Sequence, residues 1–152
     1  MKKATTGSYS FLAAMIFFVD RWTKHLVLYG WSGCKINDFL SVDLVFNRGM
    51  SFGLFHSQDL IIFTLVNLLI ASVIGLLTWH AYTRLRAGKN IIGEVFIFTG
   101  AISNVLDRYL HGAVVDFISL SYHHWHFAIF NCADVFIFIG VILMLFLEYN
   151  DL

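Results

Sequence analysis

Acidic, basic and amide side chains recur at helical spacing inside stretches that are otherwise apolar. The three sets are Asp20, Thr23 and Lys24; Asn104, Asp107 and Arg108; and Asn131 and Asp134. Separations of three and four residues place each set on one face of a helix. Polar groups within membrane spans avoid lipid and pair with one another. We therefore expect at least three helices to direct polar faces into one shared pocket.

Asp116 and Asp134 are the candidates for acid–base chemistry, because neither has a basic neighbour at helical or strand spacing. Asp116 interrupts an apolar, strand-like face, and Asp134 lies near the start of the last apolar stretch. Burial and a second nearby carboxylate both disfavour ionisation, so such a pair would share a proton and titrate together. Aspartic proteases use this arrangement of one acid and one base. Spacing alone leaves catalysis and a structural polar cluster as equal alternatives.

The remaining acids have bases beside them in the sequence. Asp20 precedes Lys24 by one helical turn, and Asp107 is followed by Arg108. Neutralised ion pairs and interhelical hydrogen bonds hold bundles together. We interpret Asp20, Lys24 and Asp107 as structural support for the pocket.

The histidine and cysteine residues give weaker signals. His123, His124 and His126 form a cluster that could bind a metal, but no H-E-x-x-H motif is present and no acid lies within the cluster. We favour an interfacial aromatic loop and expect no metal site. Cys34 and Cys132 are too few to form a disulfide framework, and we expect two free thiols.

Composition places the chain among membrane proteins. Of its 152 residues, 59% are hydrophobic and 13% are charged, whereas soluble domains carry about 25% charged residues. The formal net charge is zero, which gives no indication of a nucleic-acid partner. We expect a single membrane domain over residues 1–152.

Hydrophobic patterning predicts an α-helical integral membrane protein. Four apolar stretches are long enough to cross a bilayer, and they cover residues 9–29, 60–80, 91–108 and 131–149. Period-two alternation between them favours strands and predicts a small extracytoplasmic β-element over residues 35–53 and 113–122. Residues 123–130 are expected to form an aromatic connection.

Basic residues indicate the orientation of these spans. Lys2 and Lys3 precede the first span, and Arg84, Arg86 and Lys89 lie between the second and third. Because cytoplasmic loops carry an excess of Lys and Arg, both termini are expected in the cytoplasm. The polar pocket then lies on the extracytoplasmic side.

Five motifs, in order along the chain, resemble those of the bacterial lipoprotein signal peptidases (signal peptidase II). They are Asp20-Arg21-Trp22-Thr23-Lys24, Phe46-Asn47-Arg48-Gly49-Met50-Ser51-Phe52-Gly53, Asn104-Val105-Leu106-Asp107-Arg108, Gly112-Ala113-Val114-Val115-Asp116-Phe117, and Phe130 through Gly140. The chain departs from the family pattern at Arg21, where Gln is common, and at Ser103, where Gly is usual. The connection after Trp125 also lacks a frequent Pro.

The resemblance implies an aspartic endopeptidase of the bacterial plasma (inner) membrane with Asp116 and Asp134 as its catalytic dyad. It implies four spans with a β-element that cradles substrate, and no metal or cofactor. Its substrates would be prolipoproteins whose lipobox Cys carries a diacylglyceryl group, cleaved just before that Cys among membrane lipids, with globomycin as an inhibitor. Candidates for holding substrate or orienting the dyad are Asn47, Gly49, Asn104, Arg108 and Asn131.

Three other functions compete with this interpretation. A proton-coupled transporter would use intramembrane carboxylates, but it predicts polar residues through the full depth of the bilayer rather than a one-sided pocket. A metal-dependent protease would use the three clustered histidines. A structural subunit would have no need of two uncompensated acids.

Overall fold

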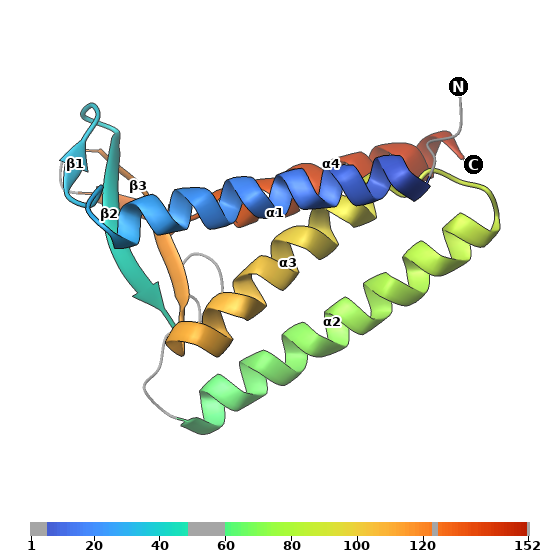
Figure 1. The fold of residues 1–152 in the computed structure, drawn as a ribbon, viewed down its shortest axis with the longest axis horizontal. Helices are drawn as coiled ribbons and strands as arrows, with labels where there is room; N and C mark the ends of the chain where they lie inside the picture. The colour runs from blue at the N-terminus through green and yellow to red at the C-terminus, as the bar shows by residue number, and fades with distance from the viewer. Residues whose placement is uncertain (1–5, 49–59, 123–124, 152) are drawn as a thin grey trace.

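In the part of the chain that the structure describes, four helices and a four-stranded antiparallel sheet make up the fold (Figure 1). The structure, a computed structural model, describes residues 6–48, 60–122 and 125–151. Its elements in chain order are α1 (Thr6–Leu28), β1 (Cys34–Lys35), β2 (Leu40–Asn47), α2 (Leu60–Arg86), α3 (Ile92–His111), β3 (Val114–Tyr122), β4 (Trp125–Phe130) and α4 (Cys132–Asn150). Each predicted span therefore corresponds to one helix.

Two of these helices are long and apolar enough to cross a membrane by length and composition, namely Ile61–Arg86 of α2 and Cys132–Asn150 of α4. The other two, α1 and α3, carry charged side chains such as Asp20, Lys24 and Asp107 that are buried inside the bundle. The α2 helix continues beyond the predicted end at residue 80 to Arg86, and Arg84 in its last turn forms an ion pair with Glu94 of α3.

The helices converge at one end of the molecule and diverge at the other (Figure 1). The sheet lies at the divergent end, while both termini and the α2–α3 connection lie at the opposite end. Helices α1, α3 and α4 pack together, and α2 contacts the bundle mainly through α3. The termini thus share a side with the α2–α3 connection, as the basic residues predict; which side faces the cytoplasm stays a prediction.

A seam of glycines brings α3 and α4 close together. A Cβ added to Gly140 would lie 2.7 Å from the carbonyl oxygen of Gly93, and one on Gly100 would lie 2.7 Å from that of Ala133. Small residues allow helix backbones to approach closely in membranes, where burial of apolar surface drives association only weakly. This contact fixes the start of α4 against α3, which places Asp134 beside Asn104.

The sheet has the strand order β1-β2-β3-β4, with all neighbours antiparallel. In the central pair, Val45 lies opposite Asp116 and Asn47 opposite Val114. The prediction that residues 123–130 form a loop was wrong for Trp125–Phe130, which is strand β4 paired with β3. The strands β1 and β2 occupy only part of the predicted range 35–53, and Gly49 lies outside the described residues.

Candidate active site

Asp116 is buried near the start of β3, only 1% exposed. Gly112 ends α3 in the left-handed conformation (φ 68°), and its N–H bonds the carbonyl of Arg108. This turn, which favours glycine, leads directly into β3. The Asp116 carboxylate accepts hydrogen bonds from Asn47 Nδ2 at 2.9 Å and from Asn131 Nδ2 at 2.6 Å. Strand β2 and the start of α4 therefore both hold this side chain.

Asp134 lies in the first turn of α4, where it forms a capping box with Asn131. Its backbone N–H bonds Asn131 Oδ1 at 3.0 Å, and its Oδ2 accepts the Asn131 N–H at 3.3 Å. Its Oδ1 accepts Asn104 Nδ2 at 3.0 Å. Carboxylates at a helix N-terminus satisfy backbone donors and interact favourably with the helix dipole. The residue types that start α4 thus also fix the direction of this carboxyl group.

Asn131 connects the two acids. Its Nδ2 contacts Asp116 Oδ1 at 2.6 Å and Asn104 Oδ1 at 3.2 Å, while its Oδ1 caps α4 at Asp134. Asn131 is itself fully buried. One side chain therefore sets the position of Asp116 relative to Asp134.

Both carboxyl groups line a single cavity of about 260 Å³. The cavity is mainly apolar, and its lining also includes Asn47, Leu69, Ile70, Val73, Ile74, Ile97, Ala101, Asn104, Val105, Arg108, Val114 and Ile137. It extends from the start of β3 along the space between α2 and α3. An apolar cavity with a few convergent polar groups is typical of a binding or catalytic site.

Asp116 has the electrostatics of a proton donor at neutral pH. Burial is the main cause that raises the pKa of Asp116 from 3.8 to about 7. The hydrogen bond from Asn47 opposes this shift, and the nearby charge of Asp134 adds to it. Strongly perturbed acids in a cavity are candidates for function.

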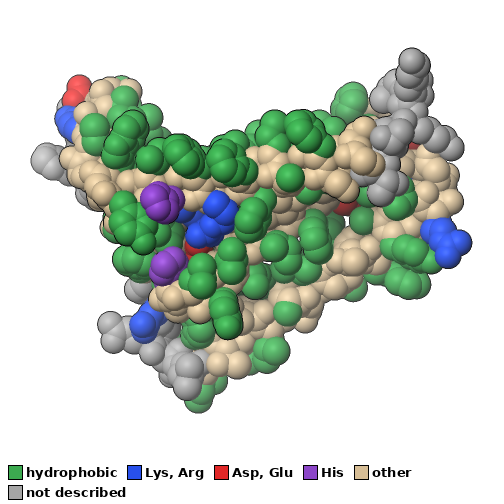
Figure 2. All heavy atoms as spheres, viewed as in Figure 1, with side chains coloured by type: hydrophobic (Ala, Val, Ile, Leu, Met, Phe, Trp, Pro, Cys, Tyr) green, Lys and Arg blue, Asp and Glu red, His purple; other side chains and the backbone are tan. Residues whose placement is uncertain are grey.

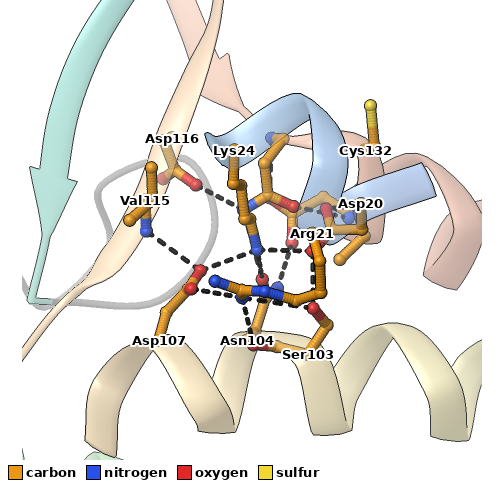
Figure 3. A network of polar contacts seen from close by, with 12 residues as sticks. Asp20, Arg21, Lys24, Ser103, Asn104, Asp107, Val115, Asp116 and Cys132 are labelled. Carbon is orange, nitrogen blue, oxygen red and sulfur yellow. Dashed lines mark hydrogen bonds and ion pairs between the residues drawn. The ribbon is translucent and has the colours of Figure 1, made fainter. Parts of the chain in front are cut away.

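Lys24 is the centre of a buried network beside the cavity (Figure 3). Its Nζ lies 2.8 Å from Asp20 Oδ2, 2.7 Å from Asp107 Oδ2 and 2.8 Å from Asn104 Oδ1. The side chains of Asp20, Lys24 and Asp107 are at most 1% exposed. The role of these three residues as structural support for the pocket stays a prediction.

The two supporting acids hold the backbone next to the two candidate catalytic acids. Asp107 Oδ2 accepts the N–H of Val115 at 3.2 Å, and Val115 immediately precedes Asp116. Asp20 Oδ1 accepts the N–H of Ala133 at 2.7 Å, and Ala133 immediately precedes Asp134. The network therefore positions both β3 and α4 through their main chains.

The structure extends the ion pairing expected from the sequence and adds a residue. Asp107 pairs with Lys24 and Arg21 of α1 (Figure 3), and it also interacts electrostatically with its sequence neighbour Arg108, the base that the sequence suggested. Arg108 lines the cavity. Arg21 was missed as part of the site, and its only signal in the sequence is that it replaces a common Gln. Figure 2 shows Lys and Arg side chains gathered in a recess between α1 and α3, on a face otherwise covered largely by hydrophobic side chains.

Metal ligands do not gather among residues 6–48, 60–122 and 125–151, where no group of three or more His, Cys, Asp or Glu side chains could hold a metal ion. His123 and His124 of the histidine cluster lie outside these residues. Cys34 and Cys132 are both free thiols. Cys132 Sγ accepts a contact from Thr23 Oγ1 at 3.5 Å, which links α4 to α1.

Comparison with solved structures assigns this fold to bacterial membrane enzymes. Two such structures match with TM-scores of 0.75 and 0.74, at 25% and 26% identity. Each match covers 99% of this chain, and 92% and 98% of the respective solved chain. This agreement and the two apolar helices support a membrane location.

The chain belongs to the signal peptidase (SPase) II family, whose model matches residues 12–149. It is 36% identical to a lipoprotein signal peptidase of Rickettsia akari (strain Hartford) over 85% of this chain, which spans 63% of that relative's length. It is 33% identical to the lipoprotein signal peptidase of Chromobacterium violaceum, covering 88% of this chain and 85% of the relative. The family resemblance expected from the five motifs is thus confirmed.

Proposed function

We propose that this chain is an aspartic endopeptidase that removes the signal peptide from diacylglyceryl-modified prolipoproteins, cutting before the lipidated Cys. The observation that carries the proposal is the pair Asp116 and Asp134, which line one cavity and are joined through Asn131. Family membership supports the substrate class. The chain crosses the plasma membrane four times, with both termini cytoplasmic and the cavity near the extracytoplasmic interface.

The mechanism begins with Asp116 protonated and Asp134 ionised. The high pKa of Asp116 supports the first role, and the position of Asp134 at the N-terminus of α4 supports the second. Asp134 removes a proton from water, which attacks the scissile carbonyl, while Asp116 donates its proton to the carbonyl oxygen. The roles then reverse: Asp134, now protonated, donates to the leaving amine as the C–N bond breaks, and ionised Asp116 takes back the proton from one hydroxyl of the tetrahedral intermediate as the carbonyl re-forms. Acid–base catalysis of this kind contributes roughly 10²–10⁴-fold.

Positioning of the peptide supplies much of the remaining rate enhancement. Arg108 lines the cavity beside the dyad and provides N–H donors for substrate carbonyls. Asn47 and Asn104 each hold one acid through Nδ2, so they orient the dyad. Gly49 keeps the role of a substrate-binding candidate because it follows Asn47 in the same motif.

The apolar part of the cavity accommodates the hydrophobic segment of the signal peptide. Its walls include Leu69 and Val73 of α2 and Ile97 of α3. Only the peptide at the cleavage point must reach the carboxyl groups, so the diacylglyceryl chains remain among the membrane lipids. This arrangement explains why a buried acid pair is placed beside an apolar channel.

Cleavage of a diacylglyceryl-modified prolipoprotein peptide by the purified chain tests the proposal. We expect turnover that globomycin inhibits and a chelator leaves unchanged. Asp116→Asn and Asp134→Asn should each reduce kcat by at least about 100-fold without loss of the folded state. Asp38→Asn is the matched control, because Asp38 is exposed and, within the part of the chain that the structure describes, its ion pair is with the likewise exposed Lys35.

Near-normal turnover by either dyad variant would remove that residue from the mechanism. Sensitivity to chelators would instead favour the metal-dependent protease that the histidine cluster suggests. Cleavage of an unlipidated peptide at an equal rate would contradict the substrate class.

A further inference from the structure

Two of the positions at which the sequence departs from the family pattern, Arg21 and Ser103, lie in contact with each other (Figure 3). Arg21 Nη1 lies 3.3 Å from the carbonyl oxygen of Ser103 and 3.4 Å from its Oγ. Ser103 is fully buried, and its Oγ donates to Asp20 Oδ2 at 2.6 Å. The Ser103 hydroxyl therefore accepts a hydrogen bond from Arg21 and donates one to Asp20. This single side chain connects the two charged residues.

Arg21 also balances the charge of the buried network. Asp20 and Asp107 carry two negative charges, and Lys24 supplies one positive charge between them. The Arg21 guanidinium lies 2.5 Å from Asp107 Oδ1, so the four groups together are neutral. With glutamine at position 21 the same network would carry one surplus negative charge, and uncompensated buried charge is costly.

This pair acts at a distance from the substrate cavity. Neither Arg21 nor Ser103 lines the cavity that holds the two candidate catalytic acids. Each instead contacts one supporting carboxylate: Arg21 contacts Asp107, which holds the backbone before Asp116, and Ser103 contacts Asp20, which holds the backbone before Asp134. Arg21 and Ser103 therefore join the two supports through one side-chain contact between α1 and α3.

We propose that Arg21 and Ser103 form a coupled positioning pair that aligns the two catalytic carboxyl groups through Asp107 and Asp20. The proposal rests on the proposed function for its kinetic test. Arg21 adds a positive charge on this side of the two catalytic carboxyl groups. The Arg21–Ser103 pair therefore also favours the ionised form of Asp116.

The charged groups around Asp116 come from several elements. Lys24 of α1, Arg108 of α3 and Asp134 of α4 all interact with it electrostatically. Lys24 in turn is shared between Asp20 and Asp107. Without Arg21, Lys24 alone must neutralise the carboxylates of Asp20 and Asp107. Lys24 then stabilises the ionised form of Asp116 less. The direction of the effect is an upward movement of the pH at which Asp116 loses its proton.

The kinetic test compares the unaltered chain with Arg21→Gln, Ser103→Gly and the double variant. We expect Arg21→Gln to lower kcat about fivefold with KM changed less than twofold, and to move the alkaline limb of the pH–rate profile upward. For independent residues, the fold-loss of kcat in the double variant would equal the product of the two single fold-losses. We expect a loss about threefold smaller than that product, because contacting residues are coupled. Arg21→Lys should restore the pH profile but only part of kcat, because Lys keeps the charge and lacks the planar fork. Arg86→Gln, on an exposed turn of α2, should change nothing.

A second measurement follows Asp116 directly and needs no turnover. The infrared carbonyl band of the protonated carboxyl group, assigned by its loss in Asp116→Asn, is titrated in the unaltered chain and in Arg21→Gln. We expect a higher midpoint in the variant. An unchanged midpoint together with single losses that multiply would overturn the proposal. If the unaltered chain were inactive but the Asp116 midpoint still rose in Arg21→Gln, the proposed function would be contradicted and the positioning pair would not.

Discussion

A single amide governs the site at the scale of residues. Asn131 uses its Oδ1 to cap α4 and its Nδ2 to hold Asp116 at 2.6 Å. The cap satisfies a backbone donor of the helix, and the amide hydrogen bond fixes the acid on the neighbouring strand. The start of α4 and the position of Asp116 therefore both depend on the Asn131 side chain.

The protonation of Asp116 should also be visible in protein stability. Its pKa is about 7 in the folded chain and about 3.9 when exposed in an unfolded chain. The folded state therefore binds more protons between these values, and stability should fall as pH rises from about 4 to 7. We expect the melting temperature of the unaltered chain to decline over this range more than that of Asp116→Asn, which cannot ionise.

The comparison is made in one detergent by thermal unfolding at several pH values. Asp38→Asn again serves as the control, because that side chain is exposed. Parallel pH profiles for the unaltered chain and Asp116→Asn would show that Asp116 does not ionise in this range.

At the scale of elements, the close α3–α4 contact is the main constraint on the site. Both Asn104 and Asp134 belong to these two helices, and their 3.0 Å hydrogen bond depends on the separation that the glycines permit. Backbone groups lie opposite the glycines, so a larger residue cannot be accommodated by turning a flexible side chain.

Gly140→Ala should destabilise the protein and reduce activity together. The new methyl group would lie 2.7 Å from the Gly93 carbonyl oxygen and 2.8 Å from Phe96 Cβ, so α3 and α4 must move apart. Overpacking of this kind costs about 1–3 kcal/mol. Gly75→Ala in α2 is the matched control, because nothing lies within 4 Å of its added Cβ. Thermal unfolding of the two variants checks the prediction; equal stability would contradict the role of the seam.

Periodicity predicted the helices and the central strands, but not every element. The span boundaries follow from apolar length, and β2 and β3 follow from alternation. Strand β4 was missed because Trp125–Phe130 is rich in aromatic residues and shows no clear alternation. This segment is a strand because its backbone pairs with β3. The ion pair between Arg21 and Asp107 could not be predicted either, since it joins residues 86 positions apart. Local spacing indicates which face a residue occupies, whereas only packing determines its partner.

At the scale of the whole molecule, polar contacts at the two ends hold the bundle. Toward the sheet, Lys24 joins α1 to α3 through Asp107. At the opposite end, Arg84 of α2 contacts Glu94 of α3 at 3.1 Å and Asp151 after α4 at 2.8 Å. The outer surface between these two ends carries many exposed apolar side chains, such as Leu76 of α2. This distribution fits a bundle that crosses a membrane with one polar cluster near each interface.

The free thiol of Cys34 allows the orientation of that bundle to be tested. Cys34 is exposed in β1 at the sheet end, while Cys132 is partly buried. The proposed topology of four crossings with cytoplasmic termini would place the sheet outside the cytoplasm and the connection after α2 inside it. A membrane-impermeant maleimide should therefore label Cys34 in intact spheroplasts and should not label a Cys34→Ser variant. Ala87→Cys in that background, at an exposed position after α2, should be labelled only after permeabilisation. The reverse pattern would invert the topology and place the proposed active site in the cytoplasm, where a lipoprotein signal peptide is not yet translocated.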